Sequence, residues 1–239
     1  MKTSKRSVRE NESPGVITID GPAGAGKSTA ARLIALKLGF MLLDSGALYR
    51  AVALHLLRNN VLPDNNTSLD APLKTLDIHI IPGIASMRIR LGAEEVTPLL
   101  RQETIGNAAS RFAVRPEVRK ALLELQRAAA QHWGIVAEGR DMGSVVFPEA
   151  RVKFFLVADL KERARRRYLE LMGRGLACDL EAVTTEMLAR DERDQARTEA
   201  PLVKPLDALE IDSTNLSQEE VVSLMMEHIT RRMHIPGLR

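Results

Sequence analysis

The chain has 239 residues, of which 45% are hydrophobic and 27% are charged, which is ordinary for a globular protein. A chain of this length forms one domain, with at most a small inserted subdomain, and buries a core without disulfide bonds. Its single cysteine, Cys178, excludes an intrachain disulfide and a metal site built from cysteines. The histidines have no metal-ligand spacing, so a histidine-rich metal site is not expected either.

The formal net charge is only +3, but the basic residues are 25 arginines against 9 lysines. Arginine is suited to bidentate binding of phosphate oxygens. Aromatic residues make up only 3%, which leaves few rings for stacking unpaired bases. We therefore expect small phosphorylated ligands rather than a nucleic-acid partner.

The chain contains no apolar run near the ~18 residues of a membrane span. Its first residues have no apolar stretch typical of a signal peptide. These features predict a cytoplasmic protein without a membrane partner. Residues 1–14 are polar and charged, and we expect them to form a disordered tail, followed by one domain over residues 15–239.

The first half of this domain begins with a strand-like pattern. Residues 16–20 form a short β-branched run, typical of a buried strand, which leads into a glycine-rich segment and a helical pattern over 27–38. A second short strand is expected at 40–43, and a helix over 48–60. Together these segments predict a strand–loop–helix–strand–helix order.

Residues of about 63–118 have a different pattern and are interpreted as an insertion. Segments 76–80 and 87–91 alternate apolar and polar residues, with Pro82-Gly83 and Gly92 as turn residues. Such alternation predicts a small antiparallel hairpin with one exposed face. Helices are expected near 99–112 and 116–132.

The second half returns to short buried strands that alternate with helices. Strands are expected at 135–138, 152–157 and 209–212, helices over 159–173 and 180–198, and a capping box at Ser217–Glu220 opens a last helix. This order predicts an α/β fold with a doubly wound parallel sheet of five strands. The pattern G-x-x-x-x-G-K-[ST] at residues 21–28 assigns this sheet to the P-loop NTPase type.

Residues 21–28 fit the pattern G-x-x-x-x-G-K-[ST] of a phosphate-binding loop. In such loops backbone N–H groups converge on phosphate oxygens, and the following helix directs its positive end at the same anion. Lys27 is expected to reach the β- and γ-phosphates, and the Ser28 hydroxyl to ligate Mg²⁺. The motif requires a strand before it and a helix after it, and both are predicted here. The alternative is an ordinary glycine-rich turn between a strand and a helix.

Two further clusters follow predicted strands, where α/β sheets bind ligands. In residues 44–50, Ser45 and Arg50 are suitable donors to a phosphate, although a helix cap beside a solvated arginine is the alternative. In residues 138–143, Glu138 is placed to act near the metal through water, while Arg140 and Asp141 turn toward the ligand. A purely structural ionic turn is the alternative there.

A third cluster lies on the helix expected over 180–198. At about 100° per residue, one stripe holds Val183, Met187, Arg190, Asp194 and Arg197. Charges on a core-facing stripe need compensation, which a phosphorylated ligand would supply. The alternative is a set of surface ion pairs.

An arginine run at residues 161–167 belongs to a segment, about 159–178, that we interpret as a lid. Such a lid would close over the ATP phosphates and exclude water. The alternative is a solvated basic face.

Four segments in this order resemble the bacterial-type cytidylate kinases: ITIDGPAGAGKS at 17–28, LDSGALYR at 43–50, EGRDMG at 138–143 and RDERD at 190–194. The resemblance covers residues of about 15–230. It implies an ATP- and Mg²⁺-dependent kinase of pyrimidine metabolism that converts CMP and dCMP to CDP and dCDP. It also implies a monomer with a core, a nucleoside-monophosphate-binding insertion and a lid.

The resemblance also implies roles for individual residues. ATP would be bound by Gly21, Pro22, Ala23, Gly24, Ala25, Gly26, Lys27, Ser28, Thr29 and Arg166. Ser45 would touch the acceptor sugar, with Arg50, Arg140 and Arg190 on or near its phosphate; Asp194 and Arg197 would hold ribose and phosphate, and Ser110, Arg119 and Asp141 would read the cytosine edge. Lys27, Arg50, Arg140 and Arg190 would supply the catalytic positive charge.

Two departures from the family pattern and two alternatives remain. Glu138 stands where aspartate is also common, which keeps the charge but alters the distance to the metal, and the 14-residue tail is longer than such enzymes require. The chain is alternatively a P-loop kinase for another nucleoside monophosphate such as UMP, or an NTP-dependent switch.

Overall fold

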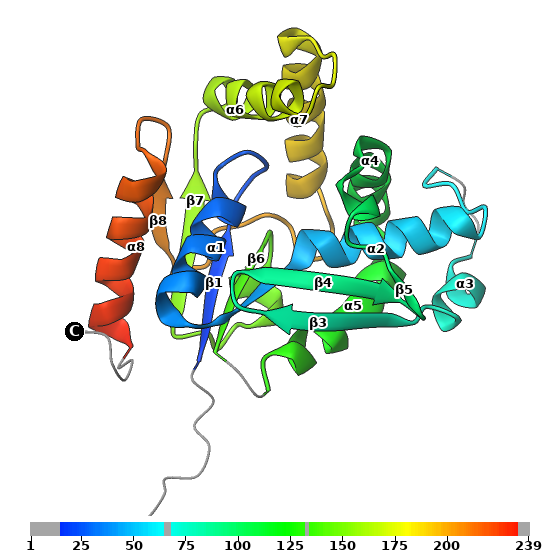
Figure 1. Cartoon of the computed structure of the whole chain (residues 1–239), viewed down its shortest axis with the longest axis horizontal. Coiled ribbons are helices and arrows are strands. Elements are labelled where there is room, and N and C mark those ends of the chain that lie inside the picture. The colour runs from blue at the N-terminus through cyan, green and yellow to red at the C-terminus, as the bar shows by residue number, and fades with distance from the viewer. Residues whose placement is uncertain (1–14, 65–67, 132–133, 234–239) are drawn as a thin grey trace, which may run out of the picture.

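The computed structural model describes residues 15–64, 68–131 and 134–233, so the expectation for residues 1–14 lies outside the described residues. The central sheet consists of β1 (Val16–Asp20), β2 (Met41–Asp44), β6 (Ile135–Gly139), β7 (Val152–Val157) and β8 (Leu209–Asp212). Its order is β2-β6-β1-β7-β8, and all neighbouring strands pair in parallel (Figure 1). The loops that follow β1, β2 and β6 therefore leave the same edge of the sheet, side by side.

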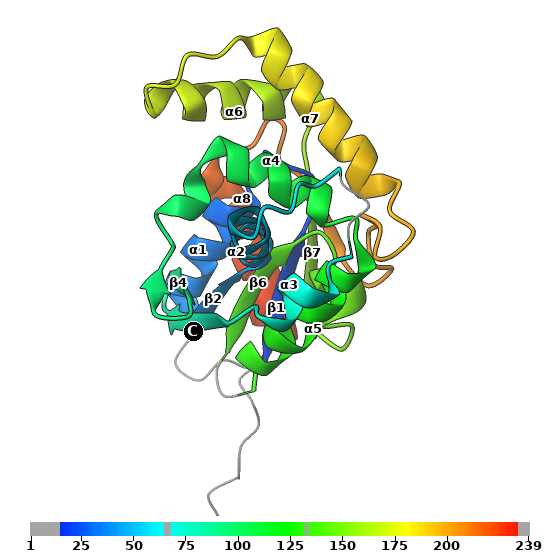
Figure 2. The same ribbon diagram turned by 90° about the vertical axis from the view of Figure 1, so that its right-hand side faces the viewer.

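Helices cover both faces of the sheet (Figure 2). On one face α1 (Lys27–Leu38) and α8 (Gln218–Arg232) pack on a core that includes Ile17, Ile19 and Val136. On the other, α2 (Ser45–Arg58) and α5 (Pro116–Ala129) share a core with Ile135 and Ala137. Adjacent residues of β6 thus enter opposite cores, as a strand buried on both faces requires. The predicted doubly wound α/β fold is confirmed.

The predicted antiparallel insertion is also present, with one correction. It forms a three-stranded sheet of β3 (Ile78–Gly83), β4 (Ser86–Leu91) and β5 (Glu94–Glu95). Pro82 and Gly83, expected in the turn, pair within the hairpin with Met87 and Ser86, and Ala85 takes the positive φ of 56° instead. Because β3 is an edge strand, Pro82 costs no essential ladder hydrogen bond.

Several helix boundaries differ from expectation: α2 ends at Arg58 and α5 at Ala129, two and three residues early, and three further differences bear on the site. The side chain of Asp44 caps α2, which begins at Ser45 rather than at 48. The helix expected over 99–112 is a 3₁₀ turn, η1 (Leu99–Arg101), and then α4 (Glu103–Phe112), because Gln102 between them is extended. The helix expected to reach 198 ends at Gln195, so Arg197 lies beyond it. A short α3 (Asp70–Lys74) precedes the hairpin.

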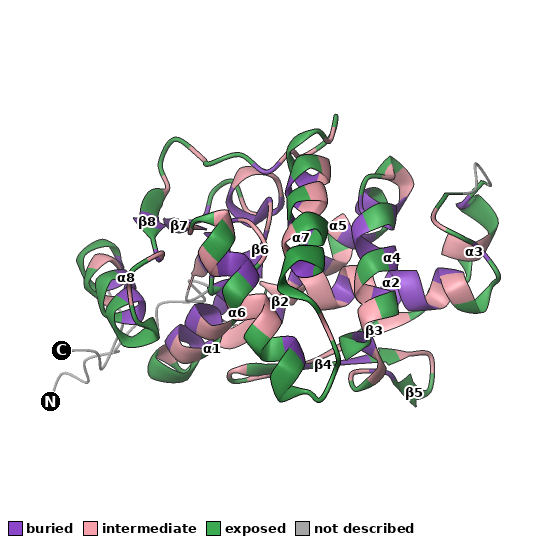
Figure 3. Ribbon diagram, turned by 90° about the horizontal axis from the view of Figure 1, so that it is seen from above, coloured by how far each residue is buried: buried purple, intermediate pink, exposed green. Residues whose placement is uncertain are grey.

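A helical pair stands at the edge of the sheet where the β1 loop emerges (Figures 1 and 2). It consists of α6 (Leu160–Gly173) and α7 (Leu180–Gln195), joined by a small core of Ala164, Leu171, Val183 and Met187. Figure 3 shows that the outer sides of both helices are exposed. The predicted capping box of α8, between Ser217 and Glu220, is confirmed. No helix in the described part of the chain is long and apolar enough to cross a membrane.

Candidate active site

The phosphate-binding loop connects β1 to α1. Gly21 has a φ of 145°, and a Cβ there would lie 2.0 Å from the backbone oxygen of Leu156 on β7, so no side chain fits. Lys27 is buried and donates to the Pro22 oxygen at 2.6 Å, which folds its side chain back over the loop. Ser28 and Thr29 follow in the first turn of α1, so residues 21–29 form one continuous loop and helix start.

Ser28 contacts the end of the neighbouring strand β6. Its Oγ donates to Oε2 of Glu138 at 2.8 Å, and Glu138 is 4% exposed. Burial, reinforced by Asp44, raises the pKa of Glu138, whereas burial together with Arg140 lowers the pKa of Lys27. The loop and the strand thus bring a hydroxyl and a carboxylate together, and oxygen ligands of this kind suit Mg²⁺.

A buried carboxylate, Asp194 on α7, organises two of the predicted arginines. Arg140 Nε donates to Asp194 Oδ2 at 2.8 Å, and Arg197 pairs with Oδ1. The Asp194 side chain is 2% exposed. The structure therefore brings Arg140, which follows β6, together with Asp194 at the end of α7 and Arg197 just beyond it.

Arg190 lies one helical turn before Asp194, and no ion pair joins it to a carboxylate among the described residues. Its Nε is buried without a hydrogen-bond partner in the described chain. Burial lowers the pKa of Arg190 to about 10. The charges of Arg140, Arg50 and Arg167 act in the same direction, and that of Asp194 opposes them. Arg50, Arg140 and Arg190 therefore form an arginine cluster with incomplete compensation, which favours an anionic ligand.

Arg119 on α5 and Asp141 after β6 form a buried ion pair. The Arg119 guanidinium lies 5.8 Å from the ring centroid of Tyr49. Beside them is a pocket of about 420 Å³ whose lining includes Tyr49, Arg119, Leu123, Gln126, Asp141 and Val146. The pocket thus presents a donor and an acceptor side by side against an aromatic ring.

Two predicted acceptor-site residues have less defined surroundings. Ser110 on α4 is buried, its hydroxyl has no hydrogen-bond partner in the described chain, and it does not line this pocket. Ser45 is buried at the start of α2. Within the described residues, neither side chain has a hydrogen bond that defines its role.

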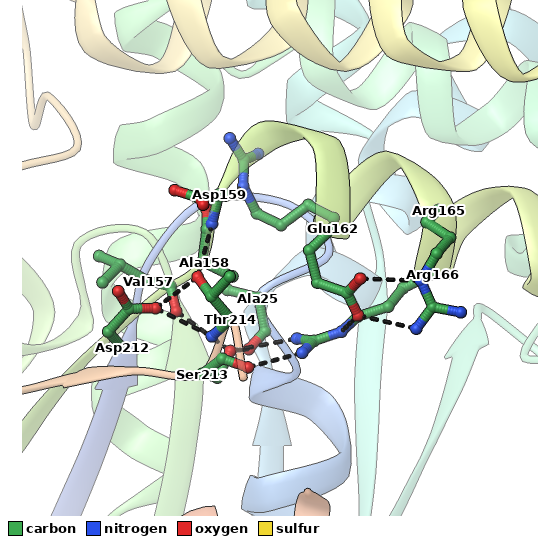
Figure 4. A network of polar contacts seen from close by, with 11 residues as sticks. Ala25, Val157, Ala158, Asp159, Glu162, Arg165, Arg166, Asp212, Ser213 and Thr214 are labelled. Atoms are coloured by element: carbon green, nitrogen blue, oxygen red, sulfur yellow. Dashed lines mark hydrogen bonds and ion pairs between the residues drawn. The ribbon is translucent and has the colours of Figure 1, made fainter. Parts of the chain in front are cut away.

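The arginine run on α6 divides into different roles. Arg166 donates to the Ser213 oxygen at 2.6 Å and to its Oγ at 3.1 Å, and Figure 4 shows its guanidinium between Glu162 and Ser213. Ser213 Oγ in turn donates to the Ala25 oxygen of the phosphate-binding loop at 3.1 Å. Arg166 is therefore held next to that loop through Ser213, a residue that the sequence did not indicate.

Two other arginines of the run connect α6 to its neighbours. Arg163 is buried, pairs with Asp191 of α7 at 2.6 Å and donates to the Ala23 oxygen of the phosphate-binding loop at 3.2 Å. Arg167 pairs with Glu103 at the start of α4. Interpreting the run as one solvated basic face is therefore wrong for Arg163.

Asp20 is a further site residue that sequence reasoning missed. It is the last residue of β1, is 1% exposed, and accepts hydrogen bonds from the backbone of Met142 and Gly143. The available signal was its position, an acid at the end of a buried strand just before the glycine-rich loop.

Comparison with known proteins covers the same segments. Residues 17–231 match a family model described as Cytidylate kinase. The chain is 46% identical over 224 residues to a Cytidylate kinase of Shewanella piezotolerans, covering 93% of this chain and 97% of that protein. It is 47% identical to a Cytidylate kinase of Carboxydothermus hydrogenoformans, covering 90% of this chain and 97% of that protein.

Proposed function

The chain belongs to the cytidylate kinase family, and we propose that it transfers the γ-phosphoryl group of ATP to CMP or dCMP, giving CDP or dCDP and ADP. The observation that carries this proposal is the arginine cluster of Arg50, Arg140 and Arg190, in which only Arg140 has an ion-pair partner, Asp194, among the described residues. The charges of Arg140 and Arg190 also act on Lys27 of the phosphate-binding loop. A cluster of this kind is suited to a second phosphate, in addition to those of the nucleoside triphosphate.

In the proposed reaction an oxygen of the CMP phosphate forms a bond to the γ-phosphorus, and the bond from that phosphorus to the β–γ bridging oxygen breaks. The attacking oxygen is already anionic, so no general base is required. The obstacle is the repulsion between two polyanions, which positioning and fixed positive charge overcome. Lys27, Arg50, Arg140 and Arg190 supply that charge.

The donor side is formed by residues 21–29 and Arg166. The exposed edge of the loop, at Gly24, Gly26 and Ser28, leaves room for phosphates, and backbone N–H groups at the start of α1 are the donors. Arg166 would exchange part of its contact with Ser213 for a phosphate oxygen of ATP. The acceptor side would use Ser45 and Arg197 with Asp194 on the sugar and its phosphate.

We propose Mg²⁺ as the accompanying cation. The Ser28 hydroxyl would bind it directly and Glu138 through water, and their contact at 2.8 Å supports this fit. When bound, the cation would neutralise charge on the ATP phosphates. Burial of Glu138 keeps its carboxylate directed at Ser28 rather than at solvent.

Base recognition would rest on Arg119, Asp141 and Ser110. Cytosine presents an N4 amino donor beside two acceptors, O2 and N3, which match the Asp141 carboxylate and the Arg119 guanidinium. Uracil presents a carbonyl in place of the N4 amino group and an N3–H in place of the N3 acceptor. The carbonyl would then face the Asp141 carboxylate, another acceptor, and the N3–H would face the Arg119 guanidinium, another donor. This contrast favours CMP over UMP.

A panel of CMP, dCMP, UMP, AMP and GMP with ATP and Mg²⁺ tests the proposal. We expect the highest kcat/KM with CMP and dCMP. A preference for any other acceptor would overturn the specificity. An NTP-dependent switch instead predicts slow ATP hydrolysis that CMP does not accelerate.

We further propose a cytoplasmic monomer. The family resemblance implies a monomer, and the substrates ATP and CMP are metabolites of the cytoplasm. Light scattering coupled to size-exclusion chromatography would give a mass near that of one chain, 26.4 kDa; a dimer mass would contradict it.

A further inference from the structure

Asp20 joins two parts of the site that are far apart in sequence. Its Oδ1 accepts from the backbone N–H of Met142 at 2.8 Å, and its Oδ2 accepts from that of Gly143 at 2.7 Å. Asp20 directly precedes the phosphate-binding loop, whereas Met142 directly follows Asp141. One buried carboxylate therefore spans from the donor loop to the turn that carries the proposed base reader.

The segment that receives these contacts is a single π-helical turn, Met142–Val146. The Val146 N–H bonds to the Asp141 oxygen at 3.1 Å, and the Phe147 N–H bonds to the Met142 oxygen at 2.7 Å. The first N–H groups of a helical turn have no partner within the turn and need an acceptor from elsewhere. Asp20 supplies both of its carboxylate oxygens to them.

Asp141 occupies the N-cap position of this turn but makes no capping hydrogen bond. An aspartate at an N-cap ordinarily turns its side chain back to the first N–H groups of its own helix. Here Asp20 occupies the N–H of Gly143, the second residue of the turn, which an N-cap side chain ordinarily binds, and also that of Met142. The Asp141 carboxylate instead pairs with Arg119 at the pocket. The cap is thus supplied from another strand, and the local aspartate is released for a different contact.

The turn is also seated closely on β1. A Cβ on Gly143 would lie 2.8 Å from Thr18 Oγ1, 3.2 Å from Lys153 Cδ and 3.3 Å from Asp20 Oδ2. Only a residue without a side chain allows the backbone to approach the strand so closely. The contact between Asp20 and the turn is therefore made at a fixed distance rather than by a flexible loop.

We propose that Asp20 is a positioning residue for base recognition: by capping the 142–146 turn in place of Asp141, it holds the Asp141 carboxylate toward Arg119 and the base. This inference rests on the proposed function, because it assigns Asp20 to the same acceptor site. Asp20 does not touch either nucleotide in this role. It acts on the base through the turn, while its contact with the donor loop is limited to the effect of its charge on Lys27.

Asp20→Asn is the direct test. Asparagine retains one acceptor oxygen but places an NH₂ group against the other backbone N–H, so one of the two capping bonds is lost. Asp141 is then free to turn back to its own helix. We expect KM for CMP to rise about tenfold or more, which corresponds to about 1.4 kcal/mol, and the preference for CMP over UMP to fall. KM for ATP should change less than KM for CMP, because the lost charge reaches the donor loop only through Lys27.

Thr18→Val is the matched control on the same strand. The Thr18 hydroxyl is buried under the same turn and has no hydrogen-bond partner in the described chain, and valine has nearly the same shape. We expect this variant to keep wild-type selectivity. Two results would show that Asp20 is merely structural and that the inference is wrong. In one, Asp20→Asn keeps the wild-type ratio of kcat/KM for CMP to kcat/KM for UMP; in the other, it raises KM for CMP and KM for ATP equally.

Gly143→Ala tests the same contact from the other side if Asp20→Asn does not fold. The added methyl group pushes the turn away from Thr18 and Asp20 while both side chains remain. A fall in CMP-to-UMP selectivity supports the inference, and unchanged selectivity overturns it. The acceptor panel with the wild type tests the proposed function separately from the role of Asp20. If the wild type prefers another acceptor, the proposed function fails. The role of Asp20 is then judged by whether Asp20→Asn raises KM for that acceptor more than KM for ATP.

Discussion

Asp194 Oδ2 accepts a hydrogen bond of 2.8 Å from Arg140 Nε, while its Oδ1 pairs with Arg197. One buried carboxylate therefore compensates two arginines of the site. Neither Arg50 nor Arg190 has an ion-pair partner of its own among the described residues. In the site, Arg140 and Arg197 are thus compensated by Asp194, whereas Arg50 and Arg190 are available to a phosphate. Removing the carboxylate should therefore affect mainly stability, and removing an unpaired arginine mainly activity.

Asp194→Asn is expected to lower the free energy of unfolding by about 3–5 kcal/mol, because Arg140 and Arg197 lose a buried counter-charge. Bound CMP should restore part of this loss, since its phosphate supplies negative charge to the same arginines. Urea unfolding with and without CMP measures both effects. Glu94→Gln, which breaks the exposed pair with Arg58, is the control and should cost less than about 1 kcal/mol. Equal losses in the two variants would contradict the prediction.

Arg190→Ala is expected to separate activity from stability. The variant should lose about 10³-fold or more in kcat, the scale of charge-supplying arginines in phosphoryl transfer. It should unfold at the same temperature or higher, because burial and neighbouring positive charges already disfavour the Arg190 charge. Turnover and thermal unfolding of the same preparation test both parts. Near-wild-type turnover would refute the role of Arg190.

Ser110→Ala is expected to have opposite effects with and without ligand. The buried hydroxyl has no partner among the described residues, and an unmade hydrogen bond of this kind costs about 1–3 kcal/mol. The ligand-free variant should therefore be as stable as the wild type or more so, while KM for CMP rises and KM for ATP does not. A stable variant with unchanged KM for CMP would remove Ser110 from the proposed base site.

The sequence predicted most reliably what is encoded locally. The phosphate-binding loop, the strand before it and the capping box of α8 depend on neighbouring residues, and each is found where expected. The hairpin was also predicted, but its turn was misplaced, because Pro82-Gly83 is a common turn pair and only the position of β3 at a sheet edge allows it within a strand.

Contacts between distant segments were not predictable in the same way. Asp20 meets Met142 and Gly143 because β6 lies beside β1 in the sheet, although the hairpin insertion separates them in the chain. The pairing of Arg163 with Asp191 depends in the same way on how α6 packs against α7. Periodicity identifies the helices, but not which arginine of a run of four turns inward.

The stability of the wild type should depend on pH through Asp20. Burial raises its pKa from 3.8 to about 6, with Asp141 acting in the same direction and the N–H groups of Met142 and Gly143 and the charge of Lys27 opposing. The folded state thus binds the proton more tightly than the unfolded chain does, so the free energy of unfolding falls as pH rises from about 4 to about 6. The fall is about 3 kcal/mol on the scale of 1.36 kcal/mol per pKa unit.

Asp20→Asn provides the reference, because its side chain does not titrate. Urea unfolding of both proteins at several pH values from 4 to 7 tests this. Between pH 4 and about 6 the free energy of unfolding of the wild type should fall relative to that of Asp20→Asn. Parallel curves would mean that the pKa of Asp20 is the same in the folded and unfolded chains.

Arg166 and Arg165 form a matched pair for testing the donor side. They are adjacent on α6 and both bind Glu162, but only Arg166 reaches Ser213 next to the phosphate-binding loop (Figure 4). Arg165 is exposed. Arg166→Ala is therefore expected to raise KM for ATP and lower kcat by about tenfold or more, whereas Arg165→Ala leaves both within about twofold, since exposed ion pairs contribute little. Steady-state kinetics with varied ATP at saturating CMP measures this difference. If the two variants behave alike, the arginine run acts only as a general basic face, and the link from Arg166 through Ser213 to Ala25 has no part in ATP binding.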